Sequence, residues 1–474
     1  MFSPLKLLGH CTKAAVLAFR SYDGAAGGRR WRGTGEMPNQ RHAMTMARGP
    51  IGRRARYLTA NSPLAAAAVE AWVSNAVGTG IKPQSAHPDR TVRAAINAAF
   101  EGFVDRADAD GVLDFYGQQA LAFRRMVVDG DVFCALSLDG ERGNPLRARL
   151  IDAEQVDPSL THDLPGGARI VAGVEFDSAG RRIAYHVLRD QRELAASFQT
   201  IRLPAEMMVH LFKPEIPGQA RGISWFAPVL LRAADADALN DAQLMRQKIA
   251  SLLTGFVVEP NGQPITFDGR PSTDGSAIDA SLEPGTMKVL TPGQDVRFSD
   301  PADIGSEAIE FIKITAREIA AGLGIPYEVM TGDLTGVNFS SIRAGLIEFR
   351  RRVEAIQHTV FVFRFCQPIW QRFVTIAALR GDIDARGFAR DPDAFFAVKW
   401  ITPRREWVDP LKDARAEIEA INAGLMSRRE AVASRGWDIE QLDEEIAADH
   451  ARATRLGLAF AAPHSPIEPT EAQP

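Results

Sequence analysis

Apolar residues recur three and four positions apart in the first third of the chain, which is typical of helices packed on one face. Asn61-Ser62-Pro63 offers a cap and a proline at the first helical position, and the apolar repeat continues to Val77. Two more helices are predicted, over about 91–106 and about 115–129. The apolar run Val132–Leu138, which is followed by Asp-Gly, then predicts a β-strand.

The hydrophobic period changes after residue 146. From there to residue 215, short apolar runs alternate with turn signals rich in glycine, proline and serine, which is typical of an antiparallel meander. The sequence therefore predicts an α+β fold with its sheet in the middle of the body. The predicted strands are Arg147–Ile151, Val171–Phe176, Ile183–Leu188 and Met207–Phe212.

Two long helical patterns flank a loop-rich segment. Residues 223–253 are rich in Ala, Leu, Met and Gln, and they predict one long helix. Residues 255–303 carry many prolines and glycines around short apolar runs, which predicts two or three short strands. Helical spacing then returns until Gly324-Ile325-Pro326, with apolar residues at Ile309, Ile312, Ala316, Ile319 and Leu323.

A polar loop precedes a basic helix. Residues 331–338 have turn chemistry throughout, and the helical pattern that follows, over about 341–380, carries more arginines than acidic residues. We expect Pro368 to kink or split this helix, because proline lacks the backbone N–H.

The two ends of the chain differ in charge. Eight arginines and one acidic residue lie between Arg29 and Arg56, which predicts an exposed arm, with the alternative that this arm touches phosphate or an acidic partner. Residues 409–449 hold eleven acidic and five basic residues on two or three short helical patterns. The proline-rich stretch after Ala461 lacks hydrophobic periodicity and predicts disorder.

Composition narrows the class of protein. With 474 residues, of which 46% are hydrophobic and 24% charged, the chain is globular and long enough for roughly three domains. A net charge of −4 argues against a protein that coats nucleic acid by charge alone. Cys11, Cys134 and Cys366 lie far apart, which argues against a disulfide framework and a zinc knuckle and favours a reducing compartment. The longest uncharged apolar run near the start is too short to span a membrane.

Sequence motifs give no positive evidence for an enzyme. The chain has no phosphate-binding GxxxxGK[ST] loop, no GxSxG elbow and no HExxH pair. The segment Asp108-Ala109-Asp110-Gly111 resembles the middle of a calcium loop, but the twelfth position falls on Gly117, where a bidentate carboxylate is required. We therefore expect no catalytic residues, no metal site and no cofactor.

The architecture itself is the informative feature. Helices that project beyond a single core need neighbours to bury their apolar stripes, and symmetric oligomers supply such neighbours. The order and spacing of several segments also resembles the lambda-type portal proteins of tailed bacteriophages, over about residues 50–450. The segments that carry the resemblance are Asn61-Ser62-Pro63 through Ile81, 129–133, 218–229, 282–293, Gly324-Ile325-Pro326, 331–341 and Trp407-Val408-Asp409-Pro410.

The resemblance implies a portal-like α+β subunit whose parts can be assigned by residue number. These parts are a basic flexible arm (1–56), an α+β wing (57–222), a first stem helix (223–254), a clip of loops and short strands (255–303), a second stem helix (304–326), a tunnel loop (327–342), a long helix with the rest of the wing (343–404), a helical crown (405–452) and a disordered tail (453–474).

The resemblance also implies sites. Thr331, Asp333, Thr335, Asn338, Ser340, Ser341 and Arg343 would form the tunnel loop that meets passing DNA, although an ordinary surface connection remains the alternative. Ile309, Ile312, Ala316, Ile319 and Leu323 would form stem contacts between subunits. Two interpretations of Arg350, Arg351 and Arg352 stay open: solvated or intersubunit-paired arginines on a packed helix, or direct contact with DNA.

The function that the resemblance implies is a ring of about twelve subunits at one capsid vertex of a virion, assembled in the host bacterial cytoplasm. Double-stranded DNA would pass through it non-specifically during packaging and ejection, and the terminase large subunit, head-tail connector, capsid and scaffolding proteins would be partners, without a membrane. Twelve copies at −4 each carry −48, which disfavours tight DNA binding. A scaffold or shell protein, or a DNA-processing enzyme, remains the alternative, and the sequence does not separate phage, prophage and gene-transfer particle.

Overall fold

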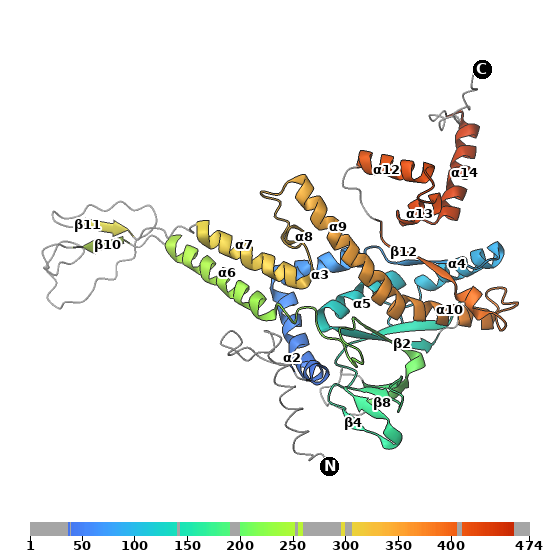
Figure 1. Cartoon of the computed structure of the whole chain (residues 1–474), viewed down its shortest axis with the longest axis horizontal. Coiled ribbons are helices and arrows are strands. Elements are labelled where there is room, and N and C mark those ends of the chain that lie inside the picture. Colours follow the sequence, from blue (N-terminus) through green and yellow to red (C-terminus); the bar gives the residue numbers. More distant parts are fainter. Residues whose placement is uncertain are drawn as a thin grey trace, which may run out of the picture. The chain divides into compact units, whose positions relative to one another are not determined.

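The computed structural model contains both helices and antiparallel strands, which confirms the predicted α+β class (Figure 1). The chain divides into a small N-terminal unit, residues 1–47, and a main unit, residues 48–474. The structure describes residues 37, 39–139, 143–189, 200–251, 255–258, 295–298, 306–404 and 410–458.

The first described helix begins earlier than the sequence pattern predicted. Helix α2 spans Gln40–Asn61, so the expectation of a flexible arm up to residue 56 is wrong for residues 40–56. Within the main unit, the side chain of Ala55 is fully buried, and Arg48 and Arg56 pair with carboxylates of the body. These arginines are therefore structural. The earlier part of the expected arm, residues 1–36, lies outside the described residues.

The three predicted helices that follow are confirmed as α3 (Pro63–Ala76), α4 (Arg90–Val104) and α5 (Phe115–Asp129). Ser62 occupies the N-cap position of α3, but its hydroxyl donates to Asp237 Oδ1 at 3.0 Å instead of capping the helix. The helices enclose an aromatic core with edge-on and tilted ring contacts. Its members include Phe100, Phe103, Phe115, Trp370 and Phe373.

The predicted meander is confirmed, but it divides into two antiparallel sheets, and the single strand predicted at Val171–Phe176 is wrong, because residues 172–173 form the turn of a hairpin. One sheet has the order β3-β2-β9, and the other has the order β4-β5-β6-β7-β8. Strand β8 was not predicted, because its run Thr-Ile-Arg-Leu-Pro has only two large apolar residues and ends on proline. The strands are β2 (Asp131–Leu138), β3 (Leu146–Ile151), β4 (His162–Asp163), β5 (Arg169–Val171), β6 (Val174–Phe176), β7 (Arg182–Leu188), β8 (Thr200–Pro204) and β9 (Met208–Phe212).

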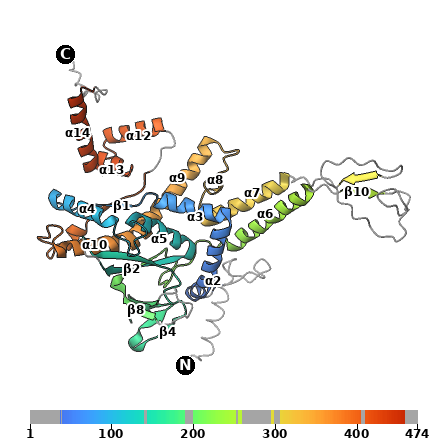
Figure 2. The ribbon, with the colours of Figure 1, turned by 180° about the vertical axis from the view of Figure 1, so that it is seen from behind.

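Helices α6 (Leu230–Ser251) and α7 (Ser306–Leu323) lie side by side and antiparallel, as both views show (Figures 1 and 2). The first is shorter than predicted, because residues 225–229 form turns in which Phe226 and Val229 enter the core. Between the two helices, β10 (Gly255–Val258) pairs with β11 (Asp295–Phe298). The rest of the predicted clip lies outside the described residues.

The segment predicted as a loop at 327–342 begins with a short helix, α8 (Tyr327–Thr331), and ends inside α9 (Phe339–Ile356). The predicted basic helix continues as a π-helical segment, η5 (Gln357–Cys366), and then as α10 (Gln367–Arg380). The pattern thus changes just before Pro368: the Gln367 N–H donates to the Val362 carbonyl, five residues back. The proline, which has no N–H to give, marks the split that the sequence predicted.

The C-terminal third returns to the body before it forms a helical unit. Beyond α11 (Pro392–Phe396), β12 (Val398–Ile401) pairs antiparallel with β1 (Lys82–Ser85). The predicted short acidic helices are α12 (Pro410–Asn422), α13 (Arg428–Ala433) and α14 (Ile439–Leu456). The predicted disordered tail is wrong for residues 453–456, because they complete α14 and Ala453 is buried. Residues 459–474 lie outside the described part.

Candidate functional site

A buried carboxylate, that of Asp131 at the start of β2, holds four segments of the main unit together. It accepts hydrogen bonds from Arg48 Nη2 at 3.1 Å and from Arg221 Nε at 2.6 Å. The Gly222 N–H donates to it at 3.1 Å, and His210 Nε2 lies 3.3 Å from its Oδ2. Arg221 also donates to three backbone carbonyl groups, those of Ala153, Val156 and Ala172.

The charges around Asp131 decide its protonation. Burial alone would raise the pKa of Asp131, but the guanidinium groups of Arg221 and Arg48 outweigh burial and hold this pKa well below its usual range. Burial lowers the pKa of His210 to about 3, so the ring is neutral at neutral pH. The centre therefore carries one anion and two cations under physiological conditions.

Neutral, buried His210 predicts a pH dependence of stability. A group whose pKa is lower in the folded than in the unfolded state, here about 3 against 6.5, takes up its proton first in the unfolded chain. Its contribution is therefore complete above pH 6.5 and is lost as the pH falls. Lowering the pH from about 6.5 to about 5 is expected to reduce the free energy of unfolding by about 2 kcal/mol.

Denaturant unfolding of the wild type and of His210→Gln across this pH range tests the prediction. The His210→Gln variant should show a flatter pH dependence, whereas the matched variant of the exposed His162, His162→Gln, should keep the wild-type slope. Equal slopes in all three proteins would contradict the assignment.

Two glycines let the backbone close over this centre. A Cβ atom on Gly222 would lie 2.0 Å from the carbonyl oxygen of Gly130, and one on Gly130 would lie 2.2 Å from the backbone of Ile223. Gly130 also has a φ of +93°, which side chains other than glycine rarely adopt. The Gly-Gln-Ala-Arg-Gly segment at 218–222 thus provides both the guanidinium for Asp131 and the close approach to the turn before β2.

The body end of α7 is part of the chain's own core. Trp72 Nε1 donates to the Leu323 carbonyl at 3.0 Å, and the Trp72 ring meets Trp225 and Phe349 edge-on at 4.9 and 5.2 Å. Ala316, Ile319 and Leu323 are at most 7% exposed in this core, so their prediction as subunit contacts is wrong. Helical periodicity identified their shared face but could not show which partner covers it. A charge at Ile319 would therefore disrupt folding before assembly.

Other apolar side chains of α6 and α7 face solvent. Phe311 is 59% and Ile314 is 45% exposed, and the helical repeat places both on the face of α7 opposite its buried residues. Ile309, which the sequence did predict, is 47% exposed, and Ile312 is half-buried. Sequence reasoning missed Phe311 and Ile314 because they fall outside the main stripe. Exposed apolar residues on α6 include Leu231, Leu244 and Met245.

The loop 332–338 follows α8 and is organised around Asp333. Its carboxylate accepts hydrogen bonds from Thr335 Oγ1 at 2.5 Å and Tyr327 OH at 3.0 Å, and pairs with Lys313 Nζ of α7 at 3.2 Å. Hydrogen bonds from Thr335, then the Lys313 and Tyr327 contacts, hold the pKa of Asp333 well below its usual range. Lys313 and Tyr327 are thus functional candidates that the sequence did not single out, because their link to Asp333 is tertiary.

The remaining predicted loop residues lie at helix ends. Thr331 donates to the Tyr327 carbonyl at 2.8 Å, and Asn338 caps α9 by accepting from the Ser341 N–H at 2.8 Å. Ser340 also lies in the first turn of α9, so it belongs to a helix where a loop was predicted. Arg343, expected as the nearby cation of the loop, pairs with Asp413 of α12 at 3.1 Å, so its charge is engaged with the C-terminal helices.

The three successive arginines of α9 have different surroundings. Arg351 is exposed and pairs with Glu348 at 3.5 Å, whereas Arg352 packs against Gly324 at the end of α7. Arg350 is half-buried and has an interaction within the chain. The contacts of these arginines within one chain do not distinguish DNA contact from pairing between subunits. Both interpretations therefore stay predictions.

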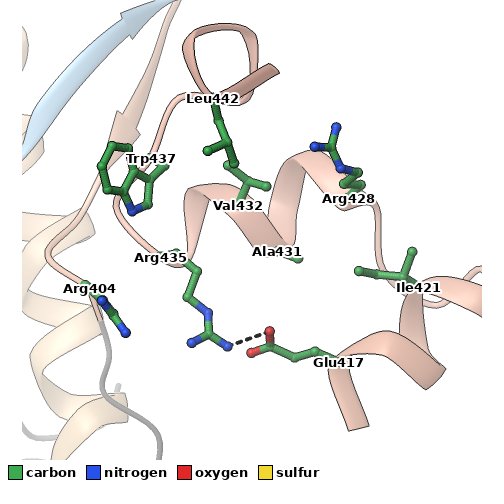
Figure 3. Close-up of a pocket in the computed structure, with 9 residues that line it drawn as sticks. All are labelled: Arg404, Glu417, Ile421, Arg428, Ala431, Val432, Arg435, Trp437 and Leu442. Carbon is green, nitrogen blue, oxygen red and sulfur yellow. Dashed lines mark hydrogen bonds and ion pairs between the residues drawn. The ribbon is translucent and has the colours of Figure 1, made fainter. Parts of the chain in front are cut away.

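The C-terminal helices surround a hollow of about 400 Å³ (Figure 3). Trp437, Val432 and Leu442 supply an apolar side, while Arg435 and Glu417 form an ion pair across it at 2.6 Å. Arg93 of α4 pairs with Glu440 at 2.9 Å, which ties this helical unit to the body.

The described residues offer no metal site. Among them, no group of three His, Cys, Asp or Glu side chains could hold an ion. Asp108 of the calcium-like segment instead accepts from the backbone N–H groups of Asp110, Val112 and Leu113, which makes it a turn-forming residue. In the same described part of the chain, every helix is too short or too polar to cross a membrane.

Comparison with known proteins places these features in a family. A relative described as a probable portal protein, from Halomonas phage phiHAP-1, is 25% identical over 447 residues and covers 90% of this chain and 85% of its own length. The portal protein of Escherichia phage N15 is 22% identical over 489 residues, covering 92% of this chain and 91% of its own.

A solved chain from the neck of a native gene transfer agent particle, computed with C12 symmetry, aligns with a TM-score of 0.45 and 13% identity, covering 82% of this chain and 97% of that chain. The sequence model of the family described as "Phage portal protein, lambda family" matches residues 27–357, well over half of the chain. This match contains α3 to α9, the Asp131 centre and the loop at 332–338, and by it the chain belongs to the lambda family of phage portal proteins.

Proposed function

We propose that about twelve copies of this chain form a ring at one capsid vertex, through which double-stranded DNA enters and leaves. The observation that carries the proposal is the unpartnered apolar face of α6 and α7. In a single chain the apolar side chains of Phe311 and Ile314 are exposed to water. Burying such a side chain against a neighbouring subunit would stabilise the assembly by about 1.5–3 kcal/mol each. Class averages of the purified chain by electron microscopy test the proposal, and closed rings with an axial hole are expected.

The ring proposal assigns roles to the other parts. Helices α6 and α7 form the stem, β10 and β11 belong to the clip, and the helices α12–α14 form the crown. The clip is proposed as the docking site for the terminase large subunit and for head-tail connector proteins, because short strands can pair edge to edge with partner chains. No catalytic role is proposed for the portal subunit.

The loop at 332–338 is proposed to face the DNA. A conduit must not accumulate phosphate contacts, because each one raises affinity and would slow a sliding duplex. The nearest cation of the loop, Lys313, is engaged by Asp333, and the loop side chains Asp333, Thr335 and Asn338 are polar. The loop thus presents a hydrogen-bonded, weakly charged surface to a passing duplex.

Loss of the Asp333 carboxylate is expected to loosen this loop. In Asp333→Asn, the amide group cannot replace the charge-assisted contact to Lys313, and its single oxygen cannot serve all the donors that the carboxylate accepts. Amide hydrogen exchange of residues 332–338 should speed up several-fold, while the melting temperature stays near that of the wild type. The same variant should package DNA less efficiently in an assay with purified terminase.

Asp384→Asn is the matched control, since Asp384 is also a loop carboxylate paired with a cation, Arg386, but lies in an exposed turn away from residues 332–338. It should leave both the exchange at 332–338 and the packaging unchanged. Unchanged exchange in Asp333→Asn would show that the carboxylate does not organise the loop. Faster exchange with normal packaging would remove the loop from the proposed DNA path.

A further inference from the structure

Three arginines gather around a small cavity in the proposed wing. The cavity has a volume of about 230 Å³ and lies against β5, β7, β9 and η5. Arg169, Arg182 and Arg364 line it, together with the rings of Phe176 and Phe212. Among the lining residues, all within the described part of the chain, there is no carboxylate. Positive charge therefore converges here without a counter-charge from these elements.

The guanidinium groups rest on aromatic rings instead of pairing with acids. Arg364 lies 4.2 Å from the centre of the Phe212 ring, and Arg182 lies 5.4 Å from the ring centres of both Phe212 and Phe176. Arg182 Nη2 donates to the Gln219 carbonyl at 2.8 Å, but the buried Nε of the same side chain has no hydrogen-bond partner. A buried N–H donor without an acceptor costs free energy, which indicates that an acceptor is missing.

The Asp131 centre shows what the cavity lacks. There, two buried arginines share one carboxylate of the same chain. Here, burial and then the neighbouring charge of Arg182 lower the pKa of Arg364, so the two cations repel each other. A carboxylate placed between them would relieve this repulsion and supply the acceptor, because the guanidinium fork matches a carboxylate in bidentate geometry.

We propose that this cavity binds an acidic side chain of a neighbouring copy of the chain. The volume suits a single side chain, and the cavity is also lined by Pro214, Ile216, Pro217 and Gly218, which favours a protein surface over a polyanion. A DNA duplex presents a row of phosphates and calls for a row of cations, whereas these three converge on one point. In a closed ring each copy presents one patch to a different patch of the next copy, so every cavity can receive one carboxylate.

The inference rests on the proposed ring, and zero-length cross-linking tests it directly. In Arg364→Lys, the ammonium group can be coupled to an adjacent carboxylate by a carbodiimide, which forms an amide bond with loss of water. Rings assembled from mixed light and heavy-isotope chains should give a mixed-isotope peptide that joins position 364 to an Asp or Glu. Arg181→Lys is the control, because Arg181 is exposed and pairs with Asp177 of its own chain, so it should give only a same-isotope link.

Ring stability provides the second readout. Arg364→Gln should raise the protein concentration needed for half-assembly on the order of tenfold. Arg364→Lys, which keeps a positive charge, should assemble at a concentration between those of Arg364→Gln and the wild type. The control Arg181→Gln should assemble at the wild-type concentration. Circular dichroism and the melting temperature of each variant control for folding.

The outcomes separate this inference from the ring itself. Wild-type rings without a mixed-isotope link at position 364, or with a link only to the same chain, would overturn the inference and leave the ring in place. Normal rings with reduced DNA retention in Arg364→Gln would also overturn it, and would assign the cavity to phosphate. Absence of wild-type rings would overturn the proposed function and the inference together.

Discussion

Replacing Asp131 by asparagine is expected to lower the free energy of unfolding of the main unit by about 3–5 kcal/mol. The substitution leaves Arg221, whose side chain is 1% exposed, and Arg48, at 5%, as buried cations without a counter-charge. Because the pKa of Asp131 is depressed in the folded state, its contribution is complete above the unfolded pKa of about 3.9 and is lost as the pH falls through the folded value. The effect should therefore be full at neutral pH.

Denaturant unfolding at pH 7, followed by circular dichroism and by tryptophan fluorescence, measures this change. Asp177→Asn is the matched control, because Asp177 pairs with Arg181 at the surface and its loss should leave the unfolding midpoint unchanged. An Asp131→Asn variant as stable as the wild type would show that the four segments around Asp131 are held by packing alone.

The double substitution Phe311→Asp and Ile314→Asp is expected to abolish ring formation while the single chain stays folded. Both side chains face away from the chain's own core, so the new carboxylates remain solvated in a monomer. In a ring they would be buried without partners, and this cost would recur at every interface of the closed assembly. Size-exclusion chromatography with light scattering would then report monomers instead of a large particle.

Phe311→Leu with Ile314→Leu is the control, because it keeps the face apolar and should retain rings. Ile319→Asp provides the contrast: Ile319 is 2% exposed in the core, so this variant should fail to fold, with loss of the cooperative unfolding transition. Normal rings from the Phe311→Asp, Ile314→Asp protein would remove the outer face of α7 from the subunit interface.

Local signals in the sequence predicted much of the fold. Proline at the start of α3 and the Gly324-Ile325-Pro326 stop after α7 act on neighbouring backbone groups, so their effect is readable without the tertiary structure. Helix α2 was missed because its arginines suggested an exposed segment. The burial of Arg48 depends on its contact with Asp131, which lies 83 residues further along the chain and cannot be inferred from local sequence. The π-helical segment was missed because its pattern of hydrogen bonds has no periodic signature over ten residues.

The candidate site was predicted less completely than the fold. The sequence identified the loop and Asp333, but Lys313 and Tyr327 join Asp333 only through the packing of α7 and α8. It also assigned the strongest apolar stripe of α7 to a partner subunit, although the part of that stripe nearest the body, Ala316, Ile319 and Leu323, packs in the chain's own core. Hydrophobic periodicity shows that one face of a helix is buried. Whether the chain's own core or a partner subunit covers that face depends on how far the helix extends from the body, which periodicity does not show.

Imaging of the purified full-length chain tests the central proposal most directly. Negative-stain electron microscopy with class averaging, repeated at several salt concentrations, should show closed rings of about twelve subunits with an axial hole wide enough for a DNA duplex. A uniform population of monomers or small dimers under all of these conditions would leave the exposed faces of α6 and α7 without partners, and it would contradict the proposed ring.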